Sequence, residues 1–280
     1  MLLDREELIE QAYFFQALRE RSEQNLATQD LLASIREELL STTKLPLAID
    51  FMAAELRLHG VVATAMAKLP HYFTPFQTYV VSEAEREGGR FDLSVALEIL
   101  ERECRYRAES ATPQGVFVFQ FETLCRNRLG YDKGLDAVAG DPIFDADWKE
   151  WIQTVRRQIG LVDLADLIYV RSAQYQKARE LAAGRDLPPE RPILFGEKEG
   201  KIALANRRKD PLLLFAALER HLGYPTVPRL KPPTAGGVQL PALIKRLERL
   251  ELRFRLLEEE GKGGIDLSKF YGGQVPRPPE

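Results

Sequence analysis

The stretch Thr112–Leu129, with the sequence TPQGVFVFQFETLCRNRL, decides the fold class of this chain. The β-branched and aromatic run Val116–Phe121 inside it suits a β-strand. Thr112 followed by Pro113 is a typical helix start, however, because threonine caps a helix and proline fits its first turn. Leu124 then continues an apolar stripe at helical spacing. The pattern favours a helix, and a strand is the alternative.

Much of the remaining chain shows the same three- and four-residue apolar spacing. Residues 45–68 are the most apolar of these segments, and a helix that is apolar nearly all round is expected at the centre of a core. Helix starts of the same kind occur at Thr74–Pro75 and Asp210–Pro211. The sequence thus predicts a mainly α protein built around a multi-helix globular domain over residues 1–183. Its expected helices include 4–25, 45–68, 75–87, 112–129, 145–159 and 172–183.

The composition changes after Gly184, where the proline-rich stretch 185–192 is typical of a linker. Residues 193–195 and 201–205 are short apolar runs on either side of the sequence GEKEG. Two such runs around a glycine-containing turn predict a β-hairpin. With the helix that follows Asp210, this hairpin defines a small hairpin-plus-helix unit over residues 188–229.

A C-terminal amphipathic helix is expected over residues 239–259, after a second linker rich in proline and glycine. Its large apolar residues alternate spacings of three and four, the heptad pattern of a helix that packs lengthwise on another helix. This helix either folds back on its own chain or binds another chain. Residues 261–280 are expected to form a flexible tail. The residues of the heptad seam proposed for interaction are Leu243, Leu247, Leu250, Phe254 and Leu257.

Composition argues against several classes of protein. The chain has 280 residues, with 39 basic and 42 acidic side chains and a net charge of −3. This balance gives no broad attraction to nucleic acid or to an anionic membrane. Two cysteines, Cys104 and Cys125, are too few for a disulfide-built secreted domain. The start has no signal-peptide pattern and no apolar run is long enough to span a bilayer, so the cytoplasm is the expected compartment.

The motifs of well-marked enzyme classes are missing from the sequence. It contains no phosphate-binding Gly-x4-Gly-Lys loop, no Gly-x-Ser-x-Gly turn, no His-Glu-x-x-His and no Cys-x-x-Cys. The three histidines, His59, His71 and His221, show no ligand spacing, so neither a metal nor a cofactor is expected. An enzyme whose site is assembled from distant residues remains open.

One region concentrates aromatic and arginine side chains. Ligand pockets are mostly apolar with a few polar groups, although aromatic residues at helical spacing more often form core. Arginines bind anionic groups in a bidentate manner, although neighbours such as Glu101 and Glu122 make ordinary ion pairs on a helix surface the alternative. The residues proposed to line a pocket here are Tyr72, Phe76, Tyr79, Arg105 and Arg126.

Two further charged groups are candidates for chemistry. Asp163 and Asp166, three residues apart, share a helix face and could act as metal ligands or as an acid/base pair. The alternative is that they mark the exposed edge of an apolar helix. The run Arg207–Lys209 precedes a helix start and could hold an anion there. The alternative is a solvated turn.

Two functional hypotheses follow from these features. The first is a non-catalytic cytoplasmic interaction or scaffold protein, which binds a protein partner or forms a homodimer through the helix over 239–259. The second is an unclassified enzyme or small-ligand binder with a pocket in the helical domain. The sequence identifies no reaction, substrate or partner.

Overall fold

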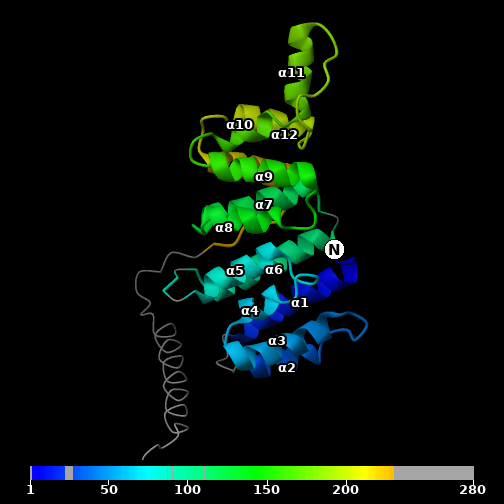
Figure 1. Cartoon of the computed structure of the whole chain (residues 1–280), viewed down its shortest axis with the longest axis vertical. Coiled ribbons are helices and arrows are strands. Elements are labelled where there is room, and N and C mark those ends of the chain that lie inside the picture. Colours follow the sequence, from blue (N-terminus) through cyan, green and yellow to red (C-terminus); the bar gives the residue numbers. More distant parts are fainter. Residues whose placement is uncertain (1, 23–27, 87, 90, 110, 230–280) are drawn as a thin grey trace, which may run out of the picture. The chain divides into compact units, whose positions relative to one another are not determined.

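The structure is a computed structural model that describes residues 2–22, 28–86, 88–89, 91–109 and 111–229. Within these ranges the chain forms helices and no sheet, which confirms the mainly α fold class (Figure 1). No helix of the described ranges is long and apolar enough to cross a membrane. The helices are α1 (Arg5–Ser22), α2 (Thr28–Arg36), α3 (Leu45–His59), α4 (Val62–Ala67), α5 (Pro75–Glu85), α6 (Leu93–Ala108), α7 (Pro113–Arg126), α8 (Tyr131–Ala139), α9 (Ala146–Gln158), α10 (Leu164–Tyr169), α11 (Ala173–Ala183), α12 (Glu197–Ala205) and α13 (Pro211–Leu222).

Side-chain caps set several of the helix starts at the predicted positions. Thr74 accepts a hydrogen bond from the backbone N–H of Gln77, whose side chain bonds back to the N–H of Thr74. This reciprocal pair is a capping box, and Pro75 occupies the first turn behind it. Thr112 and Asp145 cap α7 and α9 with their side-chain oxygens alone. Each such cap contributes about 1 kcal/mol to stability.

Helix α7, the stretch whose sequence was ambiguous, is the central element of the core. The side chains of Phe117 and Phe119 are fully buried and that of Phe121 is 2% exposed. The ring of Phe117 packs edge-on against Trp151 of α9 at 4.7 Å between centroids, and Phe121 contacts Phe215 of α13. Helices α6, α8 and α13 surround α7, so its strand-like residues serve a helix that is buried on nearly every side.

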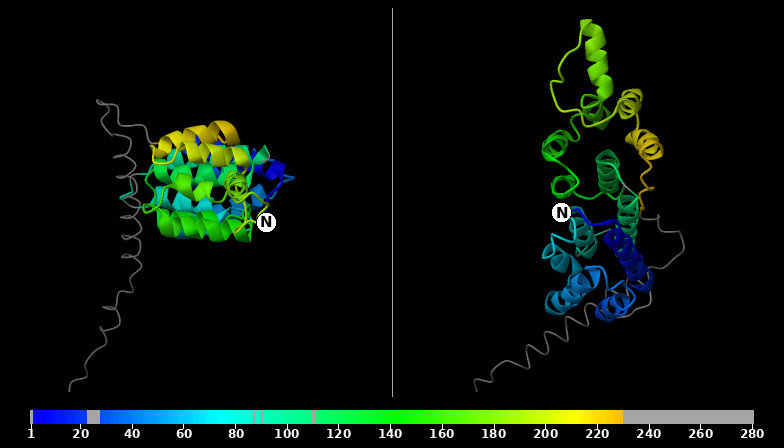
Figure 2. Two further views of the ribbon diagram at one scale, coloured as in Figure 1. Left: turned by 90° about the horizontal axis from the view of Figure 1, so that it is seen from above. Right: turned by 90° about the vertical axis from the view of Figure 1, so that its right-hand side faces the viewer.

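Most of the helices lie side by side with similar axis directions, whereas α11 runs across them and stands away from the rest (Figures 1 and 2). The most extensive helix pair is α1 with α6, and α5 also packs on α6. Ala96, Leu97 and Leu100 of α6 are buried in this region. The pairing brings the N-terminus of the chain against residues about a hundred positions later, as in the hydrogen bond from Arg5 to the carbonyl of Ala108.

The single central helix predicted over residues 45–68 is wrong in two respects. The segment divides into α3 and α4 at Gly60. This glycine adopts a left-handed conformation with φ 69°, which ends α3. Helix α3 is also not central, because Leu47 and Leu58 are 72% and 74% exposed. Apolar residues on both faces of α3 therefore serve two different surfaces, one buried and one open.

The β-hairpin predicted over residues 193–205 is wrong. Residues 197–205 form α12, whose first turn carries two glutamates that interact favourably with the helix N-terminus. Glu197 also pairs with Lys201 one turn later. Gly200, which suggested a turn, lies within the helix, and a side chain is excluded there because a Cβ would come 2.3 Å from the Oγ of Ser172. Phe195 makes only an isolated bridge to Ser172.

The described residues up to 229 belong to one compact unit. The compositional break at 184–188 falls inside this unit, where α12 packs on α10 and α11. The predicted C-terminal helix over 239–259, with Leu243, Leu247, Leu250, Phe254 and Leu257, lies outside the described residues. So does the tail over 261–280.

Candidate functional site

A cavity of about 170 Å³ lies where the N-terminal residues meet the α4–α5 connection, α6 and the α8–α9 connection. Apolar side chains form most of its wall, and a few polar groups interrupt them, as in ligand sites of other proteins. An engineered apolar cavity of about 150 Å³ binds benzene, so the volume suits a single-ring molecule. The lining residues are Leu2, Leu3, Leu8, Gln11, Pro70, His71, Tyr72, Phe73, Thr74, Gln77, Arg107, Ala111, Pro142 and Ile143.

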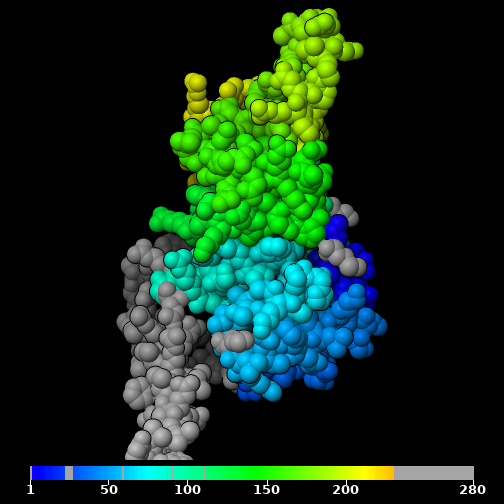
Figure 3. Space-filling model, viewed as in Figure 1, coloured from blue at the N-terminus to red at the C-terminus, as the bar shows by residue number. Residues whose placement is uncertain are grey.

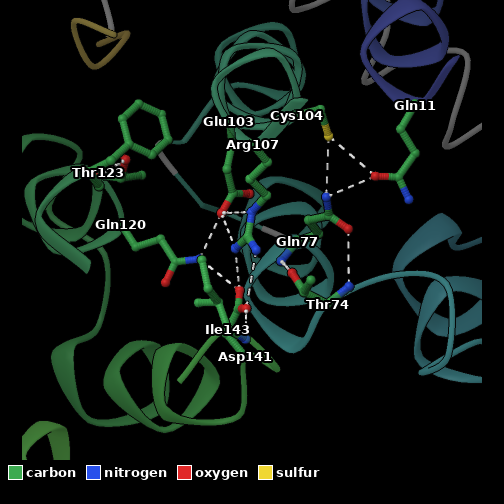
Figure 4. Close-up of polar contacts among 11 residues, drawn as sticks. Gln11, Thr74, Gln77, Glu103, Cys104, Arg107, Gln120, Thr123, Asp141 and Ile143 are labelled. Atoms are coloured by element: carbon green, nitrogen blue, oxygen red, sulfur yellow. Dashed lines mark hydrogen bonds and ion pairs between the residues drawn. The ribbon is translucent and has the colours of Figure 1, made fainter. Parts of the chain in front are cut away.

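Arg107, the cationic residue of the wall, is held by two buried carboxylates (Figure 4). Its Nε and Nη2 donate to Oε1 of Glu103 at 3.3 and 2.9 Å, and its Nη1 and Nη2 donate to the two oxygens of Asp141. Gln120 of α7 donates to both acids, at 2.7 Å to Glu103 and 3.1 Å to Asp141. The side chain of Arg107 is 6% exposed and both carboxylates are fully buried.

Burial sets the protonation of this network. Burial and repulsion from Asp141 raise the pKa of Glu103, in spite of the attraction of Arg107. Burial alone lowers the pKa of Arg107, but the two carboxylates outweigh it and raise that pKa, so the guanidinium stays charged. Oε2 of Glu103 and Oε1 of Gln120 have no hydrogen-bond partner within the described residues.

Gln11 and Gln77, which also line the cavity, belong to a second polar group. Gln77 donates to Oε1 of Gln11 at 3.2 Å, and the thiol of Cys104 donates to the same oxygen at 3.3 Å. Gln11 in turn donates to the backbone oxygen of Tyr72 at 3.1 Å. Burial raises the pKa of Cys104 well above its usual range, so the thiol keeps its proton and does not act as a nucleophile.

Arg107 and Thr74 of the wall each leave one donor for a ligand. A guanidinium has five N–H groups, and four of those on Arg107 are directed at Glu103 and Asp141. The fifth, on Nη1, has no acceptor among the described residues. The hydroxyl of Thr74 accepts from Gln77 and likewise has no acceptor for its own proton in that part of the chain. The cavity therefore combines an apolar wall with unused donors, an arrangement that recognises a hydrogen-bond acceptor.

The five residues predicted to line a pocket are not gathered at this cavity. Tyr72 borders it and donates to Oε2 of Glu7 at 2.7 Å, whereas Phe76 is fully buried in the core. The hydroxyl of Tyr79 donates to the carbonyl of Gly130. Each arginine pairs with a glutamate one turn earlier on its own helix, Arg105 with Glu101 and Arg126 with the fully buried Glu122.

The two charged groups singled out in the sequence pair with each other. Asp166 forms an ion pair with Arg207, and Asp163 caps α10 while accepting from the backbone N–H of Arg208 at 2.7 Å. These contacts tie α10 to the turn before α13. Within the described ranges no cluster of three or more histidine, cysteine or acidic residues could hold a metal ion.

Glu103, Arg107 and Asp141 are the site residues that the pocket predicted from the sequence did not include. A signal for two of them is present, because Glu103 and Arg107 fall three and seven residues after Leu100 on the buried stripe of α6. Charges on an apolar stripe at a spacing of four predict a buried pair. Asp141 lies in a connection 34 positions after Arg107, and no local pattern relates the two.

A second cavity, of about 220 Å³, lies beside α11 and is bordered by exposed residues such as Ile193 and Glu190. Of its two arginines, Arg179 and Arg191, the first is bonded to Gln176 and Glu190. Its wall is more polar than that of the Arg107 cavity.

Comparisons of the chain with protein-family models, with curated proteins and with solved structures find no match.

Proposed function

We propose that the chain binds a small organic molecule in the Arg107 cavity. The observation that carries the proposal is the remaining N–H on Nη1 of a buried, fixed arginine in an otherwise apolar cavity. A donor that is held in place by two carboxylates needs little reordering when a ligand arrives, which favours binding.

The charge of the network selects the class of ligand. Glu103 and Asp141 already supply the anionic partners of Arg107, so a third negative group beside them would be repelled. A neutral acceptor, such as a carbonyl or amide oxygen, meets the free N–H without that repulsion. The volume limits the attached apolar body to about one ring. The ligand is thus a neutral single-ring carbonyl or amide compound.

Benzamide is the probe that tests this function, by calorimetric titration of the full chain. Saturable one-site binding is expected, at least about tenfold tighter than that of benzene, because a hydrogen bond to a charged donor contributes about 1.5–3 kcal/mol. Benzoate is expected to bind more weakly than benzamide. The variant Ala111→Phe places a ring in the cavity and should abolish binding.

The matched control is Ala182→Phe, which adds the same ring to an exposed alanine of α11 and should leave binding intact. Absence of benzamide binding to the unmodified chain, or equal binding by Ala111→Phe, contradicts the proposal.

The second candidate function is a cytoplasmic interaction or scaffold protein that acts through the helix predicted over 239–259. The open apolar face of α3, with Leu47 and Leu58 about three quarters exposed, favours a role in protein association. Deletion of residues 238–280 should then reduce the solution mass or abolish partner binding. Unchanged mass and binding after this deletion would exclude the C-terminal helix as the interaction element.

A further inference from the structure

Helix α3 carries a second apolar stripe that faces away from the core. Leu47, Phe51 and Leu58 are 72%, 36% and 74% exposed, and they follow one another at intervals of four and seven residues. Those intervals place them on one face of the helix, together with the exposed Ala54. The opposite face, with Ile49 and Met52, is 1% exposed and packs in the core. Figure 3 shows part of α3 at the surface of the described chain.

Charged residues divide this face in a symmetric order. Asp50 lies between Leu47 and Phe51, and Arg57 lies next to Leu58 at the other end. Both charged side chains are exposed. Asp50 contacts Nε of Arg36 at 2.8 Å, whereas Arg57 has no ion pair with any described residue. Read from either end, the face presents an apolar residue, a charge, a central apolar pair, a charge and an apolar residue.

The order is complementary to itself when two copies of α3 lie antiparallel. Leu47 then faces Leu58 of the second copy, and Phe51 faces the small Ala54 of the second copy. A two-fold axis between the helices repeats each of these contacts. Asp50 comes beside Arg57 of the second copy, so opposite charges meet at both ends. A parallel arrangement would instead place Asp50 beside Asp50 and Arg57 beside Arg57, which is repulsive.

We propose that this face of α3 is the contact between two copies of the chain, arranged antiparallel about a two-fold axis near Phe51 and Ala54. The shared surface of a two-fold dimer must complement itself, and the residue order on this face does so. A helix that lies on a membrane surface carries many lysines and arginines on its polar side. The open face of α3 has one charge of each sign, so a second protein copy fits it better than a lipid surface.

A charge-swap cycle on the full chain tests the proposal, with solution mass measured by light scattering over a range of concentrations. The unmodified chain is expected to dimerise. Asp50→Arg alone and Arg57→Asp alone should each weaken the dimer at least about tenfold, because each places like charges together. The double variant should recover the dimer, because it restores opposite charges in exchanged positions.

The apolar arm of the test is Leu47→Asp combined with Leu58→Asp, which should give a monomer that keeps its helical circular dichroism. Leu181→Asp, at a position of α11 that is 86% exposed, is the matched control and should leave the mass unchanged. A monomeric unmodified chain overturns the proposal. A dimer that persists in the Leu47→Asp, Leu58→Asp variant also overturns it, because the contact would then lie elsewhere. A double charge swap that fails to recover the dimer overturns it for the same reason.

Discussion

Arg107 binds Asp141 through both of its terminal guanidinium nitrogens, although the two residues are 34 positions apart and belong to different segments. The contact fixes the α8–α9 connection on α6, because Asp141 also accepts from the backbone N–H of Ile143 at 3.1 Å. Ile143 in turn lines the cavity. The ion pair between Arg107 and Asp141 thus positions a polar residue of the cavity wall, Arg107, and an apolar one, Ile143.

Replacement of Arg107 by methionine should cost about 3–5 kcal/mol of unfolding free energy, because it leaves two buried carboxylates without their cation. Urea denaturation measures this value. Arg105→Met on the same helix is the control, since its side chain is 57% exposed and its pair with Glu101 contributes about 1 kcal/mol or less. Equal losses in the two variants would show that the buried network does not stabilise the fold.

The variant Glu103→Gln should change how stability depends on pH. The pKa of Glu103 is raised by burial in the folded state, so the stability contributed by its proton is fully present below the unfolded pKa, about 4.3. That contribution is lost as the pH rises through the folded pKa. Glutamine carries no titrating proton, so the stability of Glu103→Gln relative to the unmodified chain should increase with pH above about 4.3. A difference that stays constant, or falls, from pH 4 to 8 would contradict the assigned direction.

The two thiols should be unreactive in the folded protein. Cys104 is fully buried with its pKa raised by burial, and burial raises the pKa of Cys125 to about 11. Because the thiolate is the reactive form, iodoacetamide at pH 8 should modify neither cysteine on the time scale on which it modifies a free thiol. In urea both cysteines should react, which provides the control. Rapid labelling of Cys104 without denaturant would show that the Gln11–Gln77 region is open.

Gly115→Ala should destabilise the protein by about 1–3 kcal/mol, the usual cost of overpacking. A Cβ at this position would lie 2.0 Å from the hydroxyl oxygen of Tyr106, which donates to the carbonyl of Leu222. Alanine would otherwise favour a helix over glycine by up to about 1 kcal/mol, so the sign of the effect reports the contact. In the Tyr106→Phe background the penalty should shrink, as a double-mutant cycle by urea denaturation can measure. An unchanged penalty would assign the loss to a different neighbour.

Local sequence signals predicted the elements that depend on local chemistry. The caps at Thr74, Thr112 and Asp145 start helices where expected, because a cap is formed by residues within one turn of each other. The stretch 113–126 was correctly assigned as helix for the same reason. Its cap and proline outweighed the β-branched and aromatic run that follows.

Features that depend on distant neighbours were not predictable in this way. The glycine at 200 suggested a turn, but it is required by the close approach of Ser172 to α12. The apolar residues of 45–68 suggested a central helix, but Leu47 and Leu58 stay exposed on α3. Among the candidate site residues, Tyr72 was proposed from its aromatic cluster and borders the cavity, whereas the contact of Arg107 with Asp141 arises only when the chain folds.

The most direct test of ligand binding in the Arg107 cavity is a nuclear Overhauser measurement between benzamide and the full chain with labelled leucine and isoleucine methyl groups. The proposed function predicts contacts from the ring protons of benzamide to the methyls of Leu3, Leu8 and Ile143, which line the cavity. Contacts to Leu47 and Leu58 in their place, or no contacts to any methyl group, would contradict it.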